Sequence, residues 1–152
     1  EHEIALFDSL QPNEVAVLLC HQHHEIAPWG ELLSTRSQYL KAAGCLTDGS
    51  VRDVKRIRQM NFPVFAGNIG PLDSKHRGKL MWYDVPGKIH GVNVNSGDFI
   101  FGDVDGVVIV PQQITAEVVE KALQKVREEN QVRGMLENGV SLARAFEEHG
   151  IL

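Results

Sequence analysis

Several features that would assign a function at once are missing from this sequence of 152 residues. Its two cysteines, Cys20 and Cys45, stand in no paired motif, so neither a disulfide framework nor a CxxC metal site is indicated. No GxGxxG follows a predicted strand and no Walker motif is present, which argues against a dinucleotide or P-loop site. The longest apolar runs, such as 15–20, are too short to cross a bilayer. We therefore expect buried free thiols in a reducing compartment, and a cytoplasmic protein without contact to a membrane.

A basic surface is also missing. The chain has 20 acidic residues against 15 Lys and Arg, a formal net charge of −5 and a pI near 5.8. That balance argues against a nucleic-acid partner, which would need a basic stripe. It leaves small anionic substrates open, because one Arg beside helix-terminal amides can outweigh the global charge. The hydrophobic content of 43% fits one globular domain over 1–152.

Helix and strand signals alternate in the first half of the chain, and strand signals dominate the middle. We expect strands at 14–20, 45–48 and 62–67, and helices at 30–43 and 50–60. The segments 81–85, 92–95 and 98–111 form a strand-rich stretch with Pro-Gly, Ser-Gly and Asp-Gly turns. A long helix capped by Thr115 and a short helix over 141–150 follow. This order predicts a mixed α/β domain.

Three histidines, His21, His23 and His24, follow the first predicted strand. Alternate residues of an extended segment share a face, so His21 and His23 are candidates to bind one metal ion. No HExxH or CxxC pattern supplies a third ligand, and we favour the interpretation that these are loop histidines.

The next segment, Gly30-Glu31-Leu32-Leu33, predicts a helix start. The first backbone N–H groups of a helix have no intrahelical partner, and with the helix dipole they favour an anion. Glycine lets a ligand approach the backbone closely. Taken on its own, the segment is better explained as an ordinary helix start, with Glu31 complementing the dipole.

Polar residues also follow the second predicted strand. Ser50 and Asp53 have the spacing of a helix capping box, which is the structural interpretation. In the functional interpretation Arg52 forms a bidentate pair with a carboxylate, through two parallel hydrogen bonds, and Asp53 binds a hard divalent cation at a strand end. Asp103 and Asp105 stand in a turn between two strands and are interpreted as structural.

These motifs combine into a resemblance. The segments WGELLSTRSQYLKAAGCLTDGSVRDVKRIRQMNFPVFAGNIGPLDS (29–74) and GVNVNSGDFIFGDVDGVVIVP (91–111) resemble the RraA-like family, with the family's order and spacing. The enzyme members are 4-hydroxy-4-methyl-2-oxoglutarate aldolases, carbon–carbon lyases that also decarboxylate oxaloacetate. The resemblance implies a swivelling β/β/α-type domain, assembled as a homotrimer or hexamer with sites between subunits. It also implies that this chain lacks the family's usual N-terminal region.

The resemblance further implies a site for a small 2-oxo acid and a divalent cation, Mg²⁺ or Mn²⁺. In it the substrate loop is Gly30, Glu31, Leu32 and Leu33, Arg52 holds the substrate, Asp53 binds the metal, and Glu31 orients a water. Glu128 or Glu129 of the long helix is expected to add a supporting acid. The alternative is a non-catalytic relative that binds an RNA-degrading endonuclease. Such relatives usually lack the Asp after the Arg, whereas this chain has Asp53.

Overall fold

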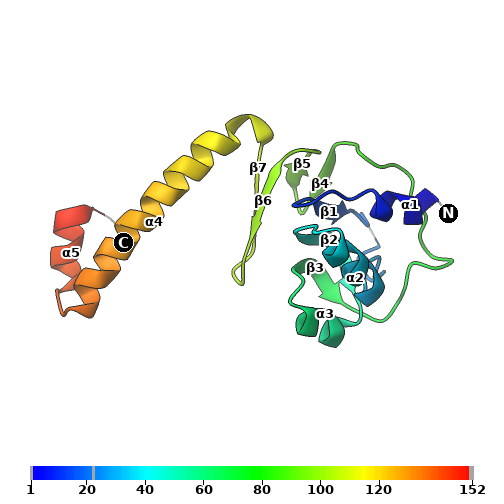
Figure 1. The fold of residues 1–152 in the computed structure, drawn as a ribbon, viewed down its shortest axis with the longest axis horizontal. Helices are drawn as coiled ribbons and strands as arrows, with labels where there is room; N and C mark the ends of the chain where they lie inside the picture. The colour runs from blue at the N-terminus through cyan, green and yellow to red at the C-terminus, as the bar shows by residue number, and fades with distance from the viewer. Residues whose placement is uncertain (1, 22, 151–152) are drawn as a thin grey trace. The chain divides into compact units, whose positions relative to one another are not determined.

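A computed structural model describes residues 2–21 and 23–150 of the chain (Figure 1). The chain divides into two compact units, residues 1–109 and residues 110–152, and each is described here by itself. The expected single domain over 1–152 stays a prediction. The alternation of helices and strands confirms the predicted α/β class.

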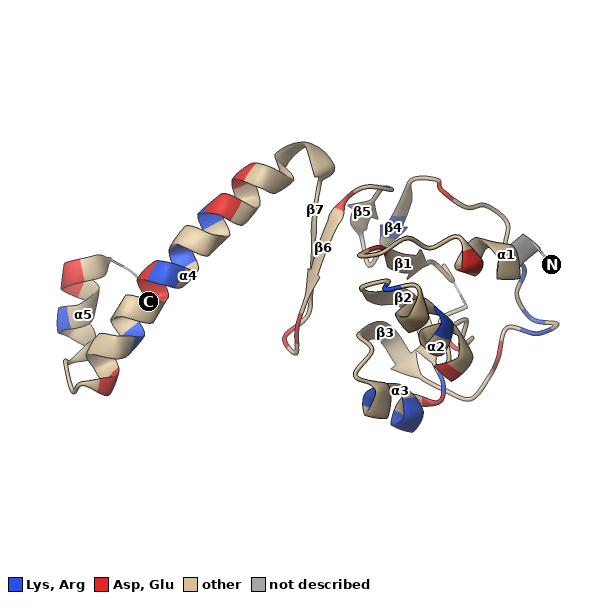
Figure 2. Cartoon of the chain, in the orientation of Figure 1, with Lys and Arg blue, Asp and Glu red and all other residues tan. Residues whose placement is uncertain are grey.

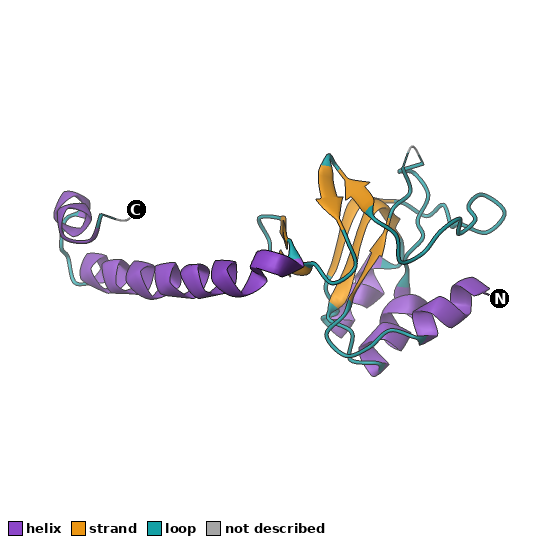
Figure 3. Ribbon diagram, turned by 90° about the horizontal axis from the view of Figure 1, so that it is seen from above, coloured by secondary structure: helices purple, strands orange, loops and turns teal. Residues whose placement is uncertain are grey.

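The first unit is organised around a parallel sheet with strand order β1-β2-β3. The strands are β1 (Val15–Leu18), β2 (Gly44–Val51) and β3 (Val64–Ile69). Parallel neighbours need crossover connections, and here α2 (Glu31–Tyr39) and α3 (Val54–Met60) provide them. The helices of this unit lie along one side of its strands (Figure 3). This arrangement places the starts of α2 and α3 at the carboxyl ends of β1 and β2.

Strand β2 is longer than its sequence predicts. It pairs with β1 from Val15↔Gly44 and with β3 from Cys45↔Val64, and all of its residues are buried. Asp48 and Gly49 form a dipeptide that is typical of turns, but here they continue the strand, with a shift of register between Thr47 and Ser50. The predicted helix over 50–60 is therefore wrong at its start, because pairing with β3 and the bridge from Val51 to Trp29 override the local turn signal.

The core of this unit forms around Trp29, which is fully buried. Its indole stacks on Phe62 at 6.3 Å between ring centroids, and the Phe7 ring meets it edge-on at 5.7 Å. Phe7 belongs to α1 (His2–Asp8). Such aromatic pairs add about 0.5–1.5 kcal/mol beyond the burial of apolar area. Trp29 thus fixes the chain immediately before the predicted substrate loop.

Two pairs of short strands complete the first unit's sheets. Strands β4 (Gly87–Ile89) and β5 (Val92–Val94) are antiparallel, and β6 (Phe99–Gly102) neighbours β7 (Val107–Val110). The predicted strand at 81–85 is wrong, since this segment is irregular, with bends at 83–85, and its side chains are exposed. Its apolar residues, including Trp82 at 67% exposure, have no buried face to pack against.

The second unit is helical. It contains a 3-10 turn (Gln112–Ile114), α4 (Thr115–Glu137) and α5 (Leu142–His149), and mixed charges run along α4 (Figure 2). The expected cap at Thr115 is wrong, because Ile114 holds the N-cap position and the Thr115 hydroxyl donates to the Pro111 carbonyl at 3.1 Å. No helix in the described part of the chain is long and apolar enough to cross a membrane.

Candidate functional site

The fold brings Gly30-Glu31 and Arg52-Asp53 together, although they lie 22 positions apart in the chain. Trp29 bridges to Val51 as in a parallel sheet, and the Arg52 amide donates to the Trp29 carbonyl at 3.1 Å. Gly30 follows Trp29 and Arg52 follows Val51, so this bridge places Gly30 and Arg52 next to each other. A pairing of two backbone segments, rather than a chance contact of side chains, positions the predicted site.

Gly30 leaves no room for a larger residue. A Cβ built on it would lie 2.8 Å from Asp53 Oδ2, 3.1 Å from Arg52 Cγ and 3.2 Å from Arg52 Nε. Its backbone is extended, with φ −157°, so any residue could adopt its conformation. Glycine is needed at this position for the close approach of the two side chains.

Asp53 connects the two helix starts. Its carboxylate oxygen Oδ2 accepts from the Glu31 amide at 3.2 Å, while its backbone carbonyl accepts from the amides of Arg56 and Ile57 at the start of α3. Asp53 has φ 58°, in the left-handed region where Asp and Asn are the commonest residues after Gly. Its side chain is exposed and does not cap α3.

The capping-box interpretation of Ser50 and Asp53 is contradicted. Ser50 is fully buried in β2, and its hydroxyl donates to the His24 carbonyl at 2.8 Å. Asp53 itself occupies the N-cap position of α3. The Asp53 carboxylate therefore does not cap α3, which was the structural interpretation of this residue.

The other residues of the predicted substrate loop differ in environment. The Thr35 hydroxyl donates to Glu31 Oε1 at 3.0 Å, which holds the Glu31 carboxylate along the first turn of α2. Leu32 is 77% exposed, whereas Leu33 packs against the core. Leu32 is thus available to a ligand or to another chain, and Leu33 anchors the helix.

A chain of buried hydrogen bonds holds the backbone of Gly30, the first residue of the predicted substrate loop. The Trp29 indole Nε1–H donates to Ser34 Oγ at 2.8 Å, and Ser34 Oγ donates to the Gly30 carbonyl at 3.0 Å. Trp29 and Ser34 are both fully buried. Sequence reasoning missed Ser34, because no motif indicates which serine of an amphipathic helix faces a tryptophan.

The three histidines lie in a separate exposed segment. His24 Nδ1 is 2.9 Å from the Asp48 carbonyl, and His23 Nδ1 is 3.7 Å from a carboxylate oxygen of Glu25. Among residues 2–21 and 23–150, no three His, Cys, Asp or Glu side chains are grouped so that they could hold a metal ion. Asp48, next to this segment, is buried and accepts from the Cys20 amide at 2.5 Å.

Both thiols are free. Cys45 is fully buried as expected, and burial raises its pKa well above the ordinary value of 9.0, with a further contribution from Cys20. Cys20 is half-buried, and desolvation followed by the charge of Asp48 raises its pKa. Both thiols therefore stay protonated and weakly nucleophilic at neutral pH.

Of the two carboxylates in this region, that of Asp53 is the better candidate for a hard cation, since the Glu31 carboxylate accepts from the Thr35 hydroxyl. The Asp53 carboxylate is exposed beside the start of α2, and Mg²⁺ usually takes one or two protein carboxylates together with waters and substrate oxygens. A single carboxylate next to Arg52 fits that pattern. It does not fit a zinc-type cage of several protein ligands.

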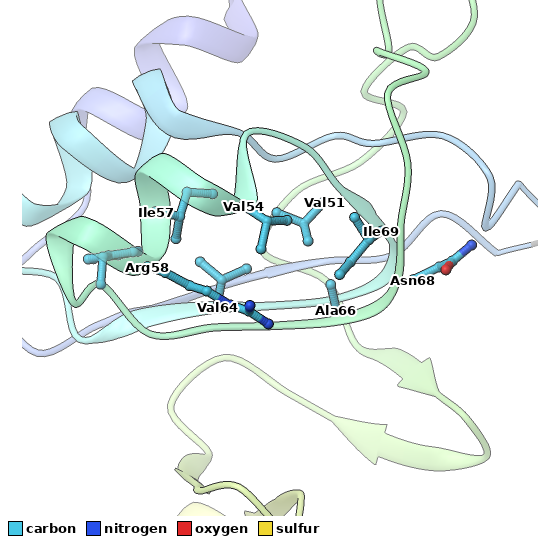
Figure 4. Close-up of a pocket in the computed structure, with 9 residues that line it drawn as sticks. Val51, Val54, Ile57, Arg58, Val64, Ala66, Asn68 and Ile69 are labelled. Atoms are coloured by element: carbon cyan, nitrogen blue, oxygen red, sulfur yellow. The ribbon is translucent and has the colours of Figure 1, made fainter.

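An apolar pocket lies nearby, between α3 and β3 (Figure 4). It has a volume of about 210 Å³ and a mostly apolar lining that includes Val51, Val54, Ile57 and Ile69, with Arg58 and Asn68 as its polar members. None of the predicted site residues lines it. The pocket lacks the helix-terminal amide and the carboxylate that meet at Gly30, Glu31, Arg52 and Asp53, so we place the candidate site at those four residues instead.

The remaining predicted residues lie elsewhere. In the turn between β6 and β7 the Asp105 amide donates to Asp103 Oδ1 at 2.8 Å, which confirms the structural interpretation. Glu128 and Glu129 belong to α4 of the second unit, where Gln124 donates to Glu128 and Lys125 lies 3.8 Å from Glu129. Their link to the site stays a prediction.

The parallel sheet with its two helix starts defines an α/β domain with a candidate anion site at strand ends. The family model described as Aldolase/RraA matches residues 3–109, and the chain belongs to this RraA-like family. It is 31% identical over 142 residues to the protein DlpA of Legionella pneumophila, covering 93% of this chain and 23% of that protein. It is 36% identical over 70 residues to a 4-hydroxy-4-methyl-2-oxoglutarate aldolase of Thermus thermophilus, covering 46% of this chain and 42% of the enzyme. The matched regions thus span less than half the length of either relative.

Solved structures agree on the fold. A crystal structure of a protein from Pseudomonas syringae pv. tomato superposes with a TM-score of 0.87 at 28% identity, covering 91% of this chain and 69% of that one. The Streptomyces coelicolor protein RraAS2, described as an unusual member of the RNase ES inhibitor RraA protein family, superposes with a TM-score of 0.75 at 28% identity. That match covers 86% of this chain and 67% of that one. The family fold expected from the sequence is confirmed.

Proposed function

We propose that this chain is a divalent-metal-dependent aldolase, a carbon–carbon lyase that cleaves 4-hydroxy-4-methyl-2-oxoglutarate or a related 4-hydroxy-2-oxo acid to pyruvate. Decarboxylation of oxaloacetate is the accompanying activity, since both reactions leave the enolate of pyruvate. The observation that carries the proposal is the meeting of Gly30, Arg52 and Asp53 within contact distance. The name of the Thermus thermophilus relative supports the reaction class.

The chain's own residues suit this chemistry. The amides at the start of α2 and the guanidinium of Arg52 bind and orient the carboxylates of a 2-oxo acid. Because its carboxylates are held in this way, the substrate keeps the bond that is cleaved in one orientation in the site. The Glu31 carboxylate, fixed by Thr35, positions a water for proton transfer. No Schiff-base lysine is required.

Asp53 is the proposed metal ligand, and Mg²⁺ or Mn²⁺ is the proposed cofactor. When bound, the divalent cation supplies Lewis-acid stabilisation for negative charge that develops on the 2-oxo oxygen. Arg52 adds a second positive charge on the same side of the substrate.

The assembly is part of the proposal. We infer a cytoplasmic homotrimer or hexamer with the site between subunits, and no nucleic-acid partner. Leu32 at 77% exposure, next to the catalytic segment, supports a site that another chain helps to enclose. Leu123 and Val126 of α4 are half-exposed and give the second unit an apolar surface for assembly.

The competing function is non-catalytic binding of an RNA-degrading endonuclease. Its support is the likeness to the Streptomyces coelicolor protein RraAS2, a member of an RNase inhibitor family. The exposed carboxylate of Asp53 favours the enzyme, because a regulator has no need of a charged oxygen ligand beside Arg52.

Pyruvate release distinguishes the two functions. The purified chain is supplied with 4-hydroxy-4-methyl-2-oxoglutarate or with oxaloacetate, in Mg²⁺, in Mn²⁺ and after removal of divalent ions by a chelator. We expect release that requires the cation and exceeds a protein-free blank, which corrects for spontaneous decarboxylation. Release equal to the blank with both substrates and both cations would overturn the aldolase in favour of the regulator.

A further inference from the structure

We propose that Ser34 is a positioning residue of the candidate site, because its hydroxyl locks the Gly30–Glu31 peptide group that faces Asp53. The inference rests on the proposed function and deepens it. It concerns the Glu31 amide, the first backbone donor of α2, which holds the Asp53 carboxylate beside the amides that bind a substrate carboxylate in that function.

The Gly30–Glu31 peptide group is held at both of its polar atoms. Its carbonyl oxygen accepts from the Ser34 amide at 3.1 Å and from Ser34 Oγ at 3.0 Å. Its N–H points to Asp53 Oδ2 at 3.2 Å. Because the peptide is planar, fixing the carbonyl also fixes the direction of the N–H.

The direction of the Ser34 hydroxyl is itself determined. Indole Nε1–H only donates, so Ser34 Oγ accepts from Trp29 and directs its own hydrogen to the Gly30 carbonyl. The indole cannot turn away, since Phe7 and Phe62 pack against its edge and face. Trp29 and Ser34 are both at 0% exposure, so water does not compete for these bonds.

In the proposed function the substrate carboxylate binds the next amides of α2, those of Leu32 and Leu33, whose direction is set by the Gly30–Glu31 peptide at the start of the helix. Small displacements of a donor weaken a charge-assisted hydrogen bond, which is short and directional. Loss of the Ser34 hydroxyl frees the Gly30 carbonyl from one of its two bonds and loosens the first turn of α2, which faces the ligand. The first effect is on binding, so KM rises while kcat changes less.

Helix α2 offers a matched control in Ser37. Ser37 is also at 0% exposure, one turn further along the helix, and its hydroxyl has no hydrogen-bond partner among the described residues. Replacement of either serine by Ala removes one buried hydroxyl. Only Ser34 is connected to the Gly30–Glu31 peptide.

The test compares Ser34→Ala, Ser34→Thr and Ser37→Ala with the wild type in cation-dependent pyruvate release, with a thermal melt of each. We expect Ser34→Ala to raise KM about fivefold, as for one lost hydrogen bond, with kcat within about twofold. Ser34→Thr restores the hydroxyl and lowers KM again, and Ser37→Ala stays within about twofold of the wild type in both constants.

A second measurement guards against a folding defect. Trp29→Phe keeps one aromatic ring against Phe62 but removes the donor, so it raises KM in the wild type and adds nothing to KM in Ser34→Ala, while the smaller ring lowers the melting temperature in both backgrounds. Equal KM values in Ser34→Ala and Ser37→Ala, or additive effects on KM with Trp29→Phe, would overturn the inference. Wild-type protein that releases no pyruvate would overturn the proposed function and this inference with it. That outcome is distinguishable because the wild type is measured beside the variants.

Discussion

The Glu31 amide lies 3.2 Å from the carboxylate oxygen Oδ2 of Asp53, so the start of α2 faces the residue that begins α3. This contact joins two segments that the sequence presents separately. It places a helix-terminal donor, a carboxylate and the neighbouring Arg52 in one small volume.

Gly30→Ala is expected to preserve the fold and remove most of the activity. The backbone conformation of Gly30 suits any residue, but an added Cβ would lie only 2.8–3.2 Å from side-chain atoms of Asp53 and Arg52, so both side chains must shift. Gly134→Ala in α4 is the control, since a Cβ there meets nothing within 4 Å. Steady-state kinetics and melting of both variants test this, and full activity in Gly30→Ala would contradict it.

Arg52→Lys is expected to lose about 2–3 kcal/mol of transition-state stabilisation in kcat/KM, because Lys cannot grip a carboxylate in two places. Arg36→Lys is the matched control. Arg36 is exposed on α2 and bonds Asp8 at 2.7 Å, away from the candidate site. Equal kinetics for the two variants would remove Arg52 from the substrate site.

Thr35→Val should lower activity about fivefold, since the Glu31 carboxylate loses a neutral donor at 3.0 Å and turns more freely. Thr35→Ser keeps the hydroxyl and serves as the control for the loss of the methyl group. If Thr35→Val matches Thr35→Ser in kcat, the orientation of Glu31 by Thr35 has no part in the reaction.

The thiols predict a pH dependence of stability. The folded-state pKa of Cys45 is raised above the unfolded value near 9.0, so the native state holds its proton longer than the unfolded chain. The free energy of unfolding therefore falls as pH rises above about 9 and is unaffected below it. Thermal melts from pH 7 to 10.5 should show a steeper fall for the wild type than for Cys45→Ala. Parallel curves for the two proteins would refute the assignment.

The sequence predicts the start of α2 at Gly30 and the alternation of helices and strands in the first unit, because helix periodicity and glycine placement are local signals. It fails at Ser50, where an Asp-Gly pair resembles a turn but the chain remains in β2, with Ser50 paired to Asn68 of β3 and Val51 bridged to Trp29. It also fails at 81–85, which has strand-like residues but no buried face. The link between Trp29 and Ser34 depends on tertiary packing, so no sequence pattern indicates it.

The central claim is that Asp53 binds the cation that the reaction needs. Asn adopts the left-handed conformation as readily as Asp and can still accept from the Glu31 amide, so Asp53→Asn should melt like the wild type. The hard dication loses a charged oxygen ligand, so affinity for Mg²⁺ and Mn²⁺ should collapse.

The most direct measurement is Mg²⁺-dependent pyruvate release from oxaloacetate by the wild type and Asp53→Asn, with a thermal melt of each. The account predicts superimposable melts, release above the blank by the wild type, and a loss of several kcal/mol in kcat/KM for the variant. Undiminished release by Asp53→Asn would contradict the metal site, and release by neither protein would contradict the enzyme.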